Sequence, residues 1–372
     1  MDYDAIVVGG GIIGLTIARR LGQAGQRVAV LEAERAWGQH ASSRNSEVVH
    51  AGIYYTPGSL KARTCREGRL RLLEYCAARA IRTRTPGKYI VACDDHERTE
   101  LEHIAQRAAA NGVMLQWCEG AEVRADEPAV QCTAALFSPT TAIVDSHALV
   151  AAVAGDVRDA GGDLVVGCRF DRATRRPGGL DVVAGDTEVS TRLLFLAAGA
   201  RSPQLATKIE GFAPLATPTG HFAKGNYFRL AGGPRFTHLV YPVPSDGGLG
   251  IHVTLDLEGN ARLGPDVEWT TGLDYDVDAT RASRFAAAAR RYAPGIEDEA
   301  LCPDYAGVRA KIVGPGEPAA DFVVSTPADH GVDGVVALFG IESPGLTAAF
   351  ALADHAIAAV HGAGSGARGL LL

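Results

Sequence analysis

The 372-residue sequence lacks several patterns that would place it in other protein classes. It has no apolar run approaching the roughly 18–20 residues of a membrane span. Lys and Arg form no stripe, and the formal net charge is −7, which argues against a nucleic-acid-binding protein. Internal repeats and low-complexity segments are also missing, apart from a short glycine-rich tail from Gly362. What is left is a globular protein with a large core and a length that suggests about two domains.

Cysteine usage points to a reducing compartment. The seven cysteines are an odd set, and none of them shows the C-x-x-C spacing of a zinc or redox site. We therefore expect free thiols, no metal site and a cytoplasmic location. The apolar stretch from Ala5 to Ala18 is not expected to be a secretory signal, because Asp2 and Asp4 precede it and glycines interrupt it.

The most specific short motif lies in the first thirty-two residues. Residues 4–8 are an apolar run of strand character, and G-G-G-I-I-G follows at once at 9–14. Apolar residues at helical spacing come next, and then a second apolar run at 28–31 that ends at Glu32. Strand, G-x-G-x-x-G turn, helix, strand and acid in this order are the fingerprint of a βαβ unit that binds a dinucleotide.

Each conserved chemical feature of this fingerprint has a physical role. Gly9 permits a tight turn, Gly11 lets the backbone approach a pyrophosphate, and Gly14 lets the helix pack closely on the strand. The start of the helix offers N–H groups and a positive dipole end to the phosphates. Glu32 can accept hydrogen bonds from a ribose diol, and its charge disfavours NADP. The unit alone fits either NAD or FAD. The other residues expected to contact the nucleotide here are Ile12, Ile13 and Ala33.

Later segments predict that the nucleotide-binding domain is discontinuous. Residues 192–200 read as a buried strand that ends in small residues, and residues 334–339 as a strand followed by a turn and a long helix. Between them, residues 212–309 read mainly as antiparallel strands with Pro and Gly turns. The expected fold is α/β plus α+β, a Rossmann-type nucleotide-binding domain with a mostly antiparallel substrate domain. The expected boundaries are 1–84, 142–211 and 320–372 for the first domain, and 85–141 and 212–319 for the second.

These segments together resemble the FAD-dependent oxidoreductases of the D-amino-acid-oxidase type, over essentially the whole chain. Within that group, six short stretches are similar to the L-2-hydroxyglutarate dehydrogenases. They are residues 44–55, which read R-N-S-E-V-V-H-A-G-I-Y-Y, and residues 57–62, 65–68, 225–228, 250–254 and 306–311. The resemblance implies non-covalent FAD and oxidation of an L-2-hydroxy acid by hydride transfer to flavin N5. Its leading substrate is L-2-hydroxyglutarate, which would give 2-oxoglutarate.

The chain departs from that family in ways that bear on the substrate rather than on the fold or the cofactor. The family usually has glycine where this chain has Glu47, and a different segment where it has residues 41–44. It has Pro-Ser-Pro-Ala-Ala-Thr where this chain has E-S-P-G-L-T at 342–347. Two other functions therefore stay open. One is an oxidase or dehydrogenase of amines, acting on glycine or a D-amino acid, and the other is a flavoprotein without catalytic activity.

Flavin-dependent oxidation of a hydroxy acid needs a carboxylate anchor and an acceptor for the hydroxyl proton. Arg309 is the candidate anchor, because a guanidinium matches a carboxylate through two hydrogen bonds. Lys311 lies on the same face of the predicted strand and suits a second carboxylate. His50 is the first candidate for the proton acceptor and His252 the second, since an unperturbed histidine titrates near pH 6.5.

Several of these residues also fit purely structural roles. Each histidine could equally be a structural residue of the core, and Arg309 a surface arginine. Tyr54 and Tyr227 are candidates for hydrogen bonds to the substrate, although core packing suits them equally well. The residues expected around the flavin, in a polar loop, at strand ends and at the start of the last helix, are Ser42, Ser43, Arg44, Asn45, Ser46, Phe170, Ala198, Gly199, Gly340, Gly345, Leu346 and Thr347.

The expected partners are a small carboxylate substrate and an electron acceptor, either oxygen or a quinone. No Cys or His is placed for a covalent link to the flavin. A peripheral contact with the inner membrane would deliver electrons to a quinone, but no strongly basic amphipathic helix supports one. The sequence makes no prediction of oligomeric state.

Overall fold

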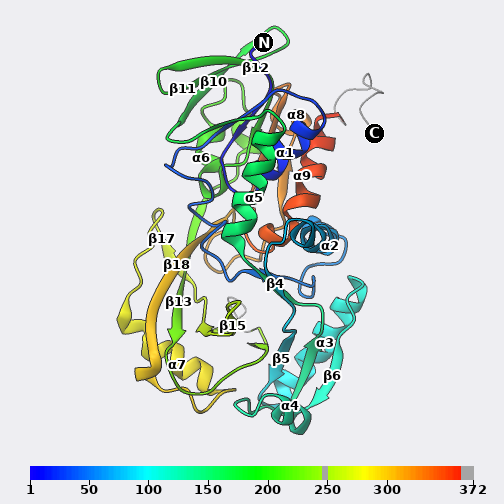
Figure 1. Ribbon diagram of the computed structural model, residues 1–372, viewed down its shortest axis with the longest axis vertical. Helices are drawn as coiled ribbons and strands as arrows, with labels where there is room; N and C mark the ends of the chain where they lie inside the picture. The colour runs from blue at the N-terminus through cyan, green and yellow to red at the C-terminus, as the bar shows by residue number, and fades with distance from the viewer. Residues whose placement is uncertain (245–249, 362–372) are drawn as a thin grey trace. The chain divides into compact units, whose positions relative to one another are not determined.

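The computed structural model describes residues 1–244 and 250–361. Contacts divide the chain into two units (Figure 1). The first unit comprises Met1–Ser43, Ser146–Phe222 and the chain from Arg309 onward, and the second comprises Arg44–Asp145 and Ala223–Val308. The glycine-rich tail from Gly362, with the last part of the predicted segment 320–372, lies outside the described residues.

The first unit is built on a sheet whose central strands are parallel. Its elements are β1 (Tyr3–Val8), α1 (Ile12–Gln23), β2 (Val28–Leu31), α5 (Ser146–Asp159), β9 (Asp163–Val165), β10 (Phe170–Arg176), β11 (Gly179–Ala184), β12 (Thr187–Leu196), η1 (Gly199–Arg201), α6 (Ser202–Ala206), η2 (Pro214–Ala216), β19 (Val323–Ser325), α8 (Pro327–His330), β20 (Val335–Phe339) and α9 (Gly345–His361). The strand order is β10-β11-β12-β1-β2-β9, with β20 paired to β12 and β19 to β20.

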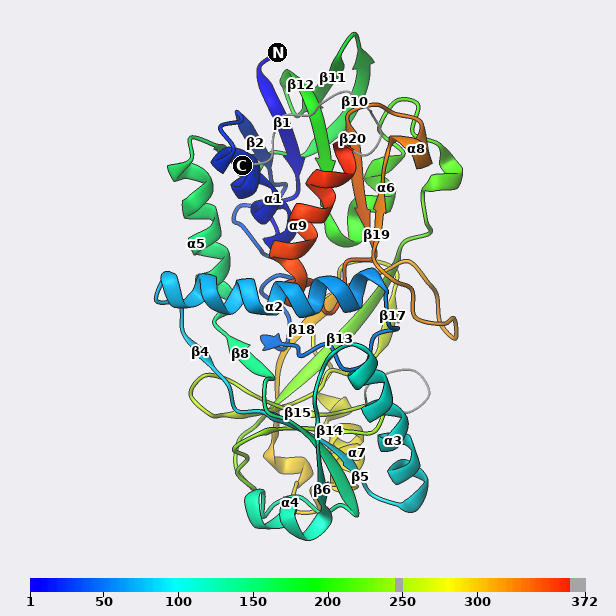
Figure 2. The same ribbon diagram turned by 90° about the vertical axis from the view of Figure 1, so that its right-hand side faces the viewer.

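Parallel pairing in this sheet joins β9, β2, β1, β12 and β20, while β10, β11 and β19 pair in antiparallel fashion. The strands β1 and β2 are almost completely buried, which explains their unbroken apolar runs. Helix α1 packs against both α5 and α9 beside these strands (Figure 2). The predicted Rossmann-type domain is therefore confirmed as a fold.

The second unit is a mostly antiparallel sheet with helices beside it. Its elements are β3 (Val48–Val49), α2 (Leu60–Ala78), β4 (Thr83–Arg84), β5 (Lys88–Ala92), α3 (Asp95–Ala110), β6 (Gln116–Glu119), α4 (Gly120–Asp126), β7 (Ala134–Ser138), β8 (Ala142–Val144), β14 (Leu239–Pro242), β15 (Val253–Leu255), β16 (Ala261–Leu263), β17 (Glu268–Thr270), η3 (Ala279–Arg281), α7 (Ala282–Arg290) and η4 (Asp298–Ala300). Two long strands, β13 (His221–Leu230) and β18 (Leu301–Lys311), each have residues in both units.

The large sheet of the second unit has the order β17-β13-β16-β15-β14-β5-β7-β6, with β18 paired to β13. Antiparallel pairs dominate, as the sequence predicted, but β5 and β14 run parallel. Leu239 is paired with Lys88 in that register, and Tyr241 with Ile90. This long-range pairing brings the start of β5 close to β14.

Residues 44–84 belong by contact to the second unit, whereas the sequence placed them in the nucleotide-binding domain. The reason is local: β3 and β4 both pair with β8, so the segment is held by a strand that precedes residue 145. Residues 142–145 likewise belong to the second unit, whereas residues 212–222 and 309–319 differ in the other direction and belong to the first unit. Helix α2 begins where predicted, because the Ser59 side chain accepts a hydrogen bond from the Ala62 N–H.

Candidate active site

The glycine turn between β1 and α1 leaves no room for side chains. Gly9 has φ +110°, and a Cβ there would lie 2.5 Å from the Ala197 carbonyl oxygen and 3.0 Å from the Ala198 Cα. A Cβ on Gly14 would lie 2.0 Å from the Gly9 carbonyl oxygen. The small residues after β12 therefore pass directly against the turn, and the close helix–strand packing predicted for Gly14 is present.

A carboxylate and a hydroxyl organise the same turn. The Glu32 side chain is 9% exposed and accepts hydrogen bonds from the N–H groups of Gly10 and Glu34, each at 2.8 Å. Ser42 Oγ accepts the Ile12 N–H at 2.9 Å, at the N-terminus of α1. The structure thus brings together the predicted Gly11, Ile12, Glu32 and Ser42 around one helix end.

These residues fit a dinucleotide. The turn offers bare backbone, and the twelve-residue helix α1 offers its N-terminal N–H groups and its dipole to a pyrophosphate. Gly9, Gly11 and the first residues of α1 would hold the phosphates, and Glu32 would meet the adenosine ribose. The orientation of Glu32 is fixed before any ligand arrives, because two backbone donors already hold it.

The polar segment predicted to surround the flavin is shared between the units. Beyond Ser42, the Arg44 guanidinium lies 4.3 Å from the centre of the Tyr275 ring and donates to the Ala306 carbonyl at 3.5 Å. The Ser46 hydroxyl lies 2.9 Å from the Tyr227 hydroxyl. These contacts are all within the second unit. The expected roles of residues 44–46 toward a flavin stay predictions.

The other residues predicted to surround the nucleotide occupy defined positions in the first unit. Phe170 is buried in the core at the start of β10, and Ala33 is exposed just after β2. Gly199 begins η1, and Gly340, at φ +69°, follows β20. The remaining ones are Ile13 in the first turn of α1, Ser43, whose N–H donates to the His40 carbonyl, and Gly345, Leu346 and Thr347, which begin α9.

Arg309 and Lys311 lie near the end of β18, as predicted. Both are half-buried and flank the buried Ala310, so they share one face of the strand. The Lys311 ammonium forms an ion pair with Glu342 at 3.0 Å, within the first unit. Glu342 is one of the departures from the family pattern. Its carboxylate pairs with the Lys311 ammonium, the group that the sequence suggested for binding a second substrate carboxylate.

The second unit contains a cluster of a lysine and aromatic rings, formed by Lys88, Tyr54, Tyr241, His252 and His50, which we call the lysine–aromatic cluster. Lys88 is 1% exposed, and its Nζ lies 4.7 Å from the centre of the Tyr54 ring and 4.4 Å from that of Tyr241. The Tyr241 and His252 rings stack at 3.8 Å and 19°. The structure thereby brings together three residues that were predicted, Tyr54, His50 and His252.

The protonation states in this cluster are set by burial. Burial, and to a smaller extent the charge of Lys88, lowers the pKa of His50 to about 3, so the ring is neutral at pH 7. Burial lowers the pKa of Lys88 to about 7. His252 Nδ1 lies 3.0 Å from the Gly250 carbonyl oxygen. Because a carbonyl only accepts, Nδ1 carries a proton, and Nε2 is the acceptor nitrogen of the corresponding neutral tautomer.

Lys88 and Tyr241 were not among the predicted site residues. Lys88 opens the apolar run 88–92, and a lysine at the edge of such a run reads as a solvent-exposed flank. In the structure all five residues of β5 are buried. The signal that could have found Lys88 is the alternation, since it shares a strand face with Ile90 and Ala92.

Comparison with known proteins identifies the class to which the chain belongs. It matches the FAD dependent oxidoreductase family over residues 4–359, and it is a member of that family. FAD is its cofactor. Within the described residues, no helix combines the length and hydropathy needed to cross a membrane, and no three His, Cys, Asp or Glu side chains are placed to share a metal ion.

Among individual relatives, the chain is 37% identical to an L-2-hydroxyglutarate dehydrogenase of Arabidopsis thaliana, over 95% of this chain and 82% of that protein. It is 29% identical to an L-2-hydroxyglutarate dehydrogenase of Escherichia coli, over 96% of this chain and 93% of that one.

Two solved structures show the same fold. The FAD-bound L-α-glycerophosphate oxidase of Mycoplasma pneumoniae aligns with a TM-score of 0.86 at 23% identity, over 96% of this chain and 94% of that one. The glycine oxidase of Geobacillus kaustophilus aligns with a TM-score of 0.81 at 19% identity, over 98% and 96%.

Proposed function

We propose that this flavoprotein oxidises L-2-hydroxyglutarate to 2-oxoglutarate. The observation that carries the proposal is the 37% identity, over 95% of the chain, to a protein named for that activity. The lysine–aromatic cluster supports it, because it holds the neutral His50 imidazole, the His252 ring and the Lys88 amine, which offer an anionic hydroxy acid a proton acceptor and a positive group. The electron acceptor is proposed to be oxygen or a quinone, and the location the cytoplasm.

The residues take distinct roles in this reaction. Arg309 holds the carboxylate next to the reacting carbon through paired hydrogen bonds. His50 accepts the proton of the substrate hydroxyl, and His252 is the second candidate because its tautomer leaves Nε2 as an acceptor. Tyr54 and Tyr227 donate hydrogen bonds to substrate oxygens. Bound FAD would supply the acceptor for the hydride of C2, so that loss of this hydride and of the hydroxyl proton would leave the ketone.

Steady-state turnover with an artificial electron acceptor tests the reaction. We expect L-2-hydroxyglutarate to give one equivalent of 2-oxoglutarate per two electrons, with no turnover of D-2-hydroxyglutarate, glycine or D-alanine. Turnover of an amino acid in place of the hydroxy acid would establish the amine-oxidising alternative.

The anchor has its own test. Arg309→Ala is expected to raise KM for L-2-hydroxyglutarate about 100-fold, because a charge-assisted pair to the carboxylate is lost. FAD content, measured by absorbance, should be unchanged. An unaltered KM would remove Arg309 from the proposed mechanism.

A further inference from the structure

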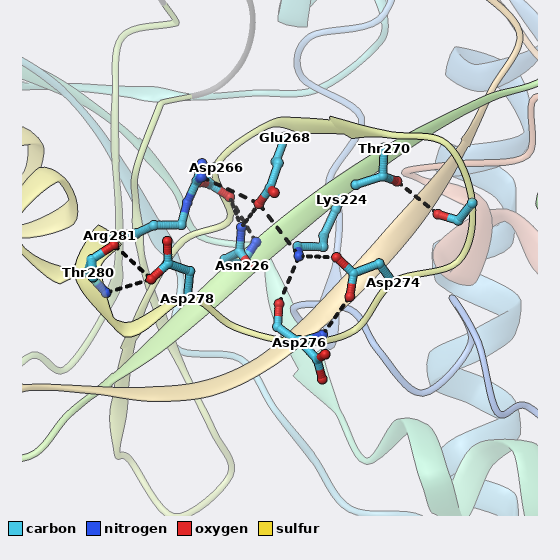
Figure 3. Close-up of polar contacts among 11 residues, drawn as sticks. Lys224, Asn226, Asp266, Glu268, Thr270, Asp274, Asp276, Asp278, Thr280 and Arg281 are labelled. Atoms are coloured by element: carbon cyan, nitrogen blue, oxygen red, sulfur yellow. Dashed lines mark hydrogen bonds and ion pairs between the residues drawn. The ribbon is translucent and has the colours of Figure 1, made fainter.

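Lys224 and Lys311 have oxygen acceptors beside their ammonium groups. Lys224, in β13, lies 2.6 Å from an Asp274 carboxylate oxygen, 3.6 Å from Glu268 and 2.8 Å from the Asp276 carbonyl (Figure 3). Lys311 has Glu342. A buried ammonium needs such partners, because removal from water penalises the charged form and only nearby acceptors offset that penalty.

Lys88 differs from both. Among the described residues no carboxylate forms an ion pair with it, and its Nζ faces the rings of Tyr54 and Tyr241. Cation–π attraction is weaker than a charge-assisted hydrogen bond and leaves the three N–H donors of a protonated lysine without an oxygen acceptor. The lowered pKa of Lys88 has the same origin, which is burial without compensation.

A second donor in the cluster has the same need. The Tyr54 hydroxyl is buried and has no hydrogen-bond partner among the described residues. An ammonium beside one face of the Tyr54 ring and an unsatisfied phenol O–H both require an acceptor, and one carboxylate group supplies two oxygens. The cluster is not sealed, because His50 and Tyr54 are only half-buried while Lys88, Tyr241 and His252 are buried.

We propose that Lys88 and Tyr54 bind the second carboxylate of a dicarboxylate substrate, and so select dicarboxylates over monocarboxylates. This inference rests on the proposed oxidation of a 2-hydroxy acid and names the residues that recognise its side chain. The sequence suggested Lys311 for binding the second carboxylate, but Lys311 already pairs with Glu342. Lys88 has no carboxylate partner among the described residues and is assigned this role instead.

Selectivity between two isosteric substrates tests the proposal in the FAD-bound protein. L-2-hydroxyglutarate is compared with L-2-hydroxyglutaramate, whose distal group is a neutral amide. In Lys88→Met, kcat/KM for the dicarboxylate should fall about 100-fold and that for the amide less than about threefold. Tyr54→Phe, which removes only the hydroxyl, should lower the dicarboxylate value about tenfold. Equal losses on both substrates would overturn the proposal.

Calorimetric measurement of glutarate binding tests the role of Lys88 without requiring any substrate to be oxidised. Wild type should bind glutarate at least tenfold more tightly than Lys88→Met, even if the proposed oxidation fails. Equal affinity would overturn the proposal, and so would a loss of dicarboxylate selectivity in Lys311→Met but not in Lys88→Met.

The melting temperatures of variants show whether Lys88 serves ligand binding or the stability of the fold. Lys88→Met should leave Tm unchanged or raise it, because the variant removes an uncompensated buried amine. Lys224→Met, the control, should lower Tm, since it leaves the Asp274 carboxylate and the Asp276 carbonyl without the ammonium that they contact. A drop in Tm for Lys88→Met as large as that for Lys224→Met would make Lys88 a structural residue.

Discussion

At the scale of single residues, the structure separates groups whose interactions are complete from groups that need a ligand. The Glu32 carboxylate is held by two backbone N–H groups and is oriented in advance. The Lys88 amine is buried against two rings. The first arrangement preorganises a binding site at little cost, whereas the second reduces stability until an anion arrives.

Removal of the Glu32 carboxylate should weaken FAD binding. We expect Glu32→Ala to raise the Kd for FAD at least tenfold, since both the ribose interaction and the anchoring of the Gly10 N–H are lost. The matched control is Glu34→Ala, two residues further on. Kd is measured by fluorescence titration of the apoprotein. Equal affinities for the two variants would contradict the role given to Glu32.

The affinity for glutarate should fall as the pH rises above 7. Lys88 loses its proton through a pKa of about 7, and only the protonated amine attracts a carboxylate. Between pH 7.5 and 9 the Kd should therefore rise by up to about tenfold per pH unit, until the pKa of the ligand-bound lysine is reached. Lys88→Met should show no such trend.

The neighbours of Lys88 do not produce this trend. The pKa of His50 is about 3, burial raises that of the Cys65 thiol to about 12, and burial raises those of Tyr54 and Tyr241. His252 stacks on Tyr241, and the Lys88→Met variant keeps this ring, so the comparison isolates the lysine. A pH-independent Kd in wild type would contradict the assignment to Lys88.

At the scale of elements, a buried polar network fixes the chain that follows β16 onto β13 (Figure 3). One Asp266 carboxylate oxygen accepts from the backbone and side-chain N–H groups of Asn226, at 2.9 and 3.0 Å, and the other accepts from Arg281 Nε at 2.9 Å. β13 also carries Tyr227, which contacts Ser46. The network therefore positions a strand that bears a proposed substrate-binding residue.

Breaking this network should be costly. Asp266→Ala removes the buried acceptor of the Asn226 backbone N–H and of Arg281 Nε, while Glu268 still contacts the Asn226 side chain and Arg281. We expect the free energy of unfolding to fall by about 3 kcal/mol. Urea denaturation of the holoprotein measures it. The control is Asp278→Ala, an exposed cap of η3, which should have a much smaller effect. A similar loss in both variants would contradict this account of the network.

The start of the second unit contains a residue in an uncommon conformation. Glu47 has φ +57°, in the left-handed region that favours glycine. The resemblance to the L-2-hydroxyglutarate dehydrogenases implies glycine at this position. Glu47 thus keeps the left-handed backbone conformation that a glycine would adopt. The Asn45 side chain stabilises this conformation by accepting a hydrogen bond from the Glu47 N–H at 2.7 Å.

At the scale of the whole molecule, local sequence patterns predicted the parts that depend on local geometry. The spacing of Gly9, Gly11 and Gly14 and the distance to Glu32 follow from one βαβ unit, so the nucleotide site could be located from the sequence. Lys88 could not, because its environment depends on the parallel pairing of β5 with β14, some 150 residues away. Alternation with Ile90 and Ala92 marks the strand face of Lys88, but it does not tell that Tyr241 of β14 lies beside it.

The most direct test of the central claim is an anaerobic titration of the holoprotein with L-2-hydroxyglutarate, followed by flavin absorbance. The account predicts stoichiometric bleaching by the L isomer and none by the D isomer. A flavin that stays oxidised with L-2-hydroxyglutarate but bleaches with glycine or a D-amino acid would contradict the proposed function. Bleaching by none of these acids would make the protein a flavoprotein of another activity.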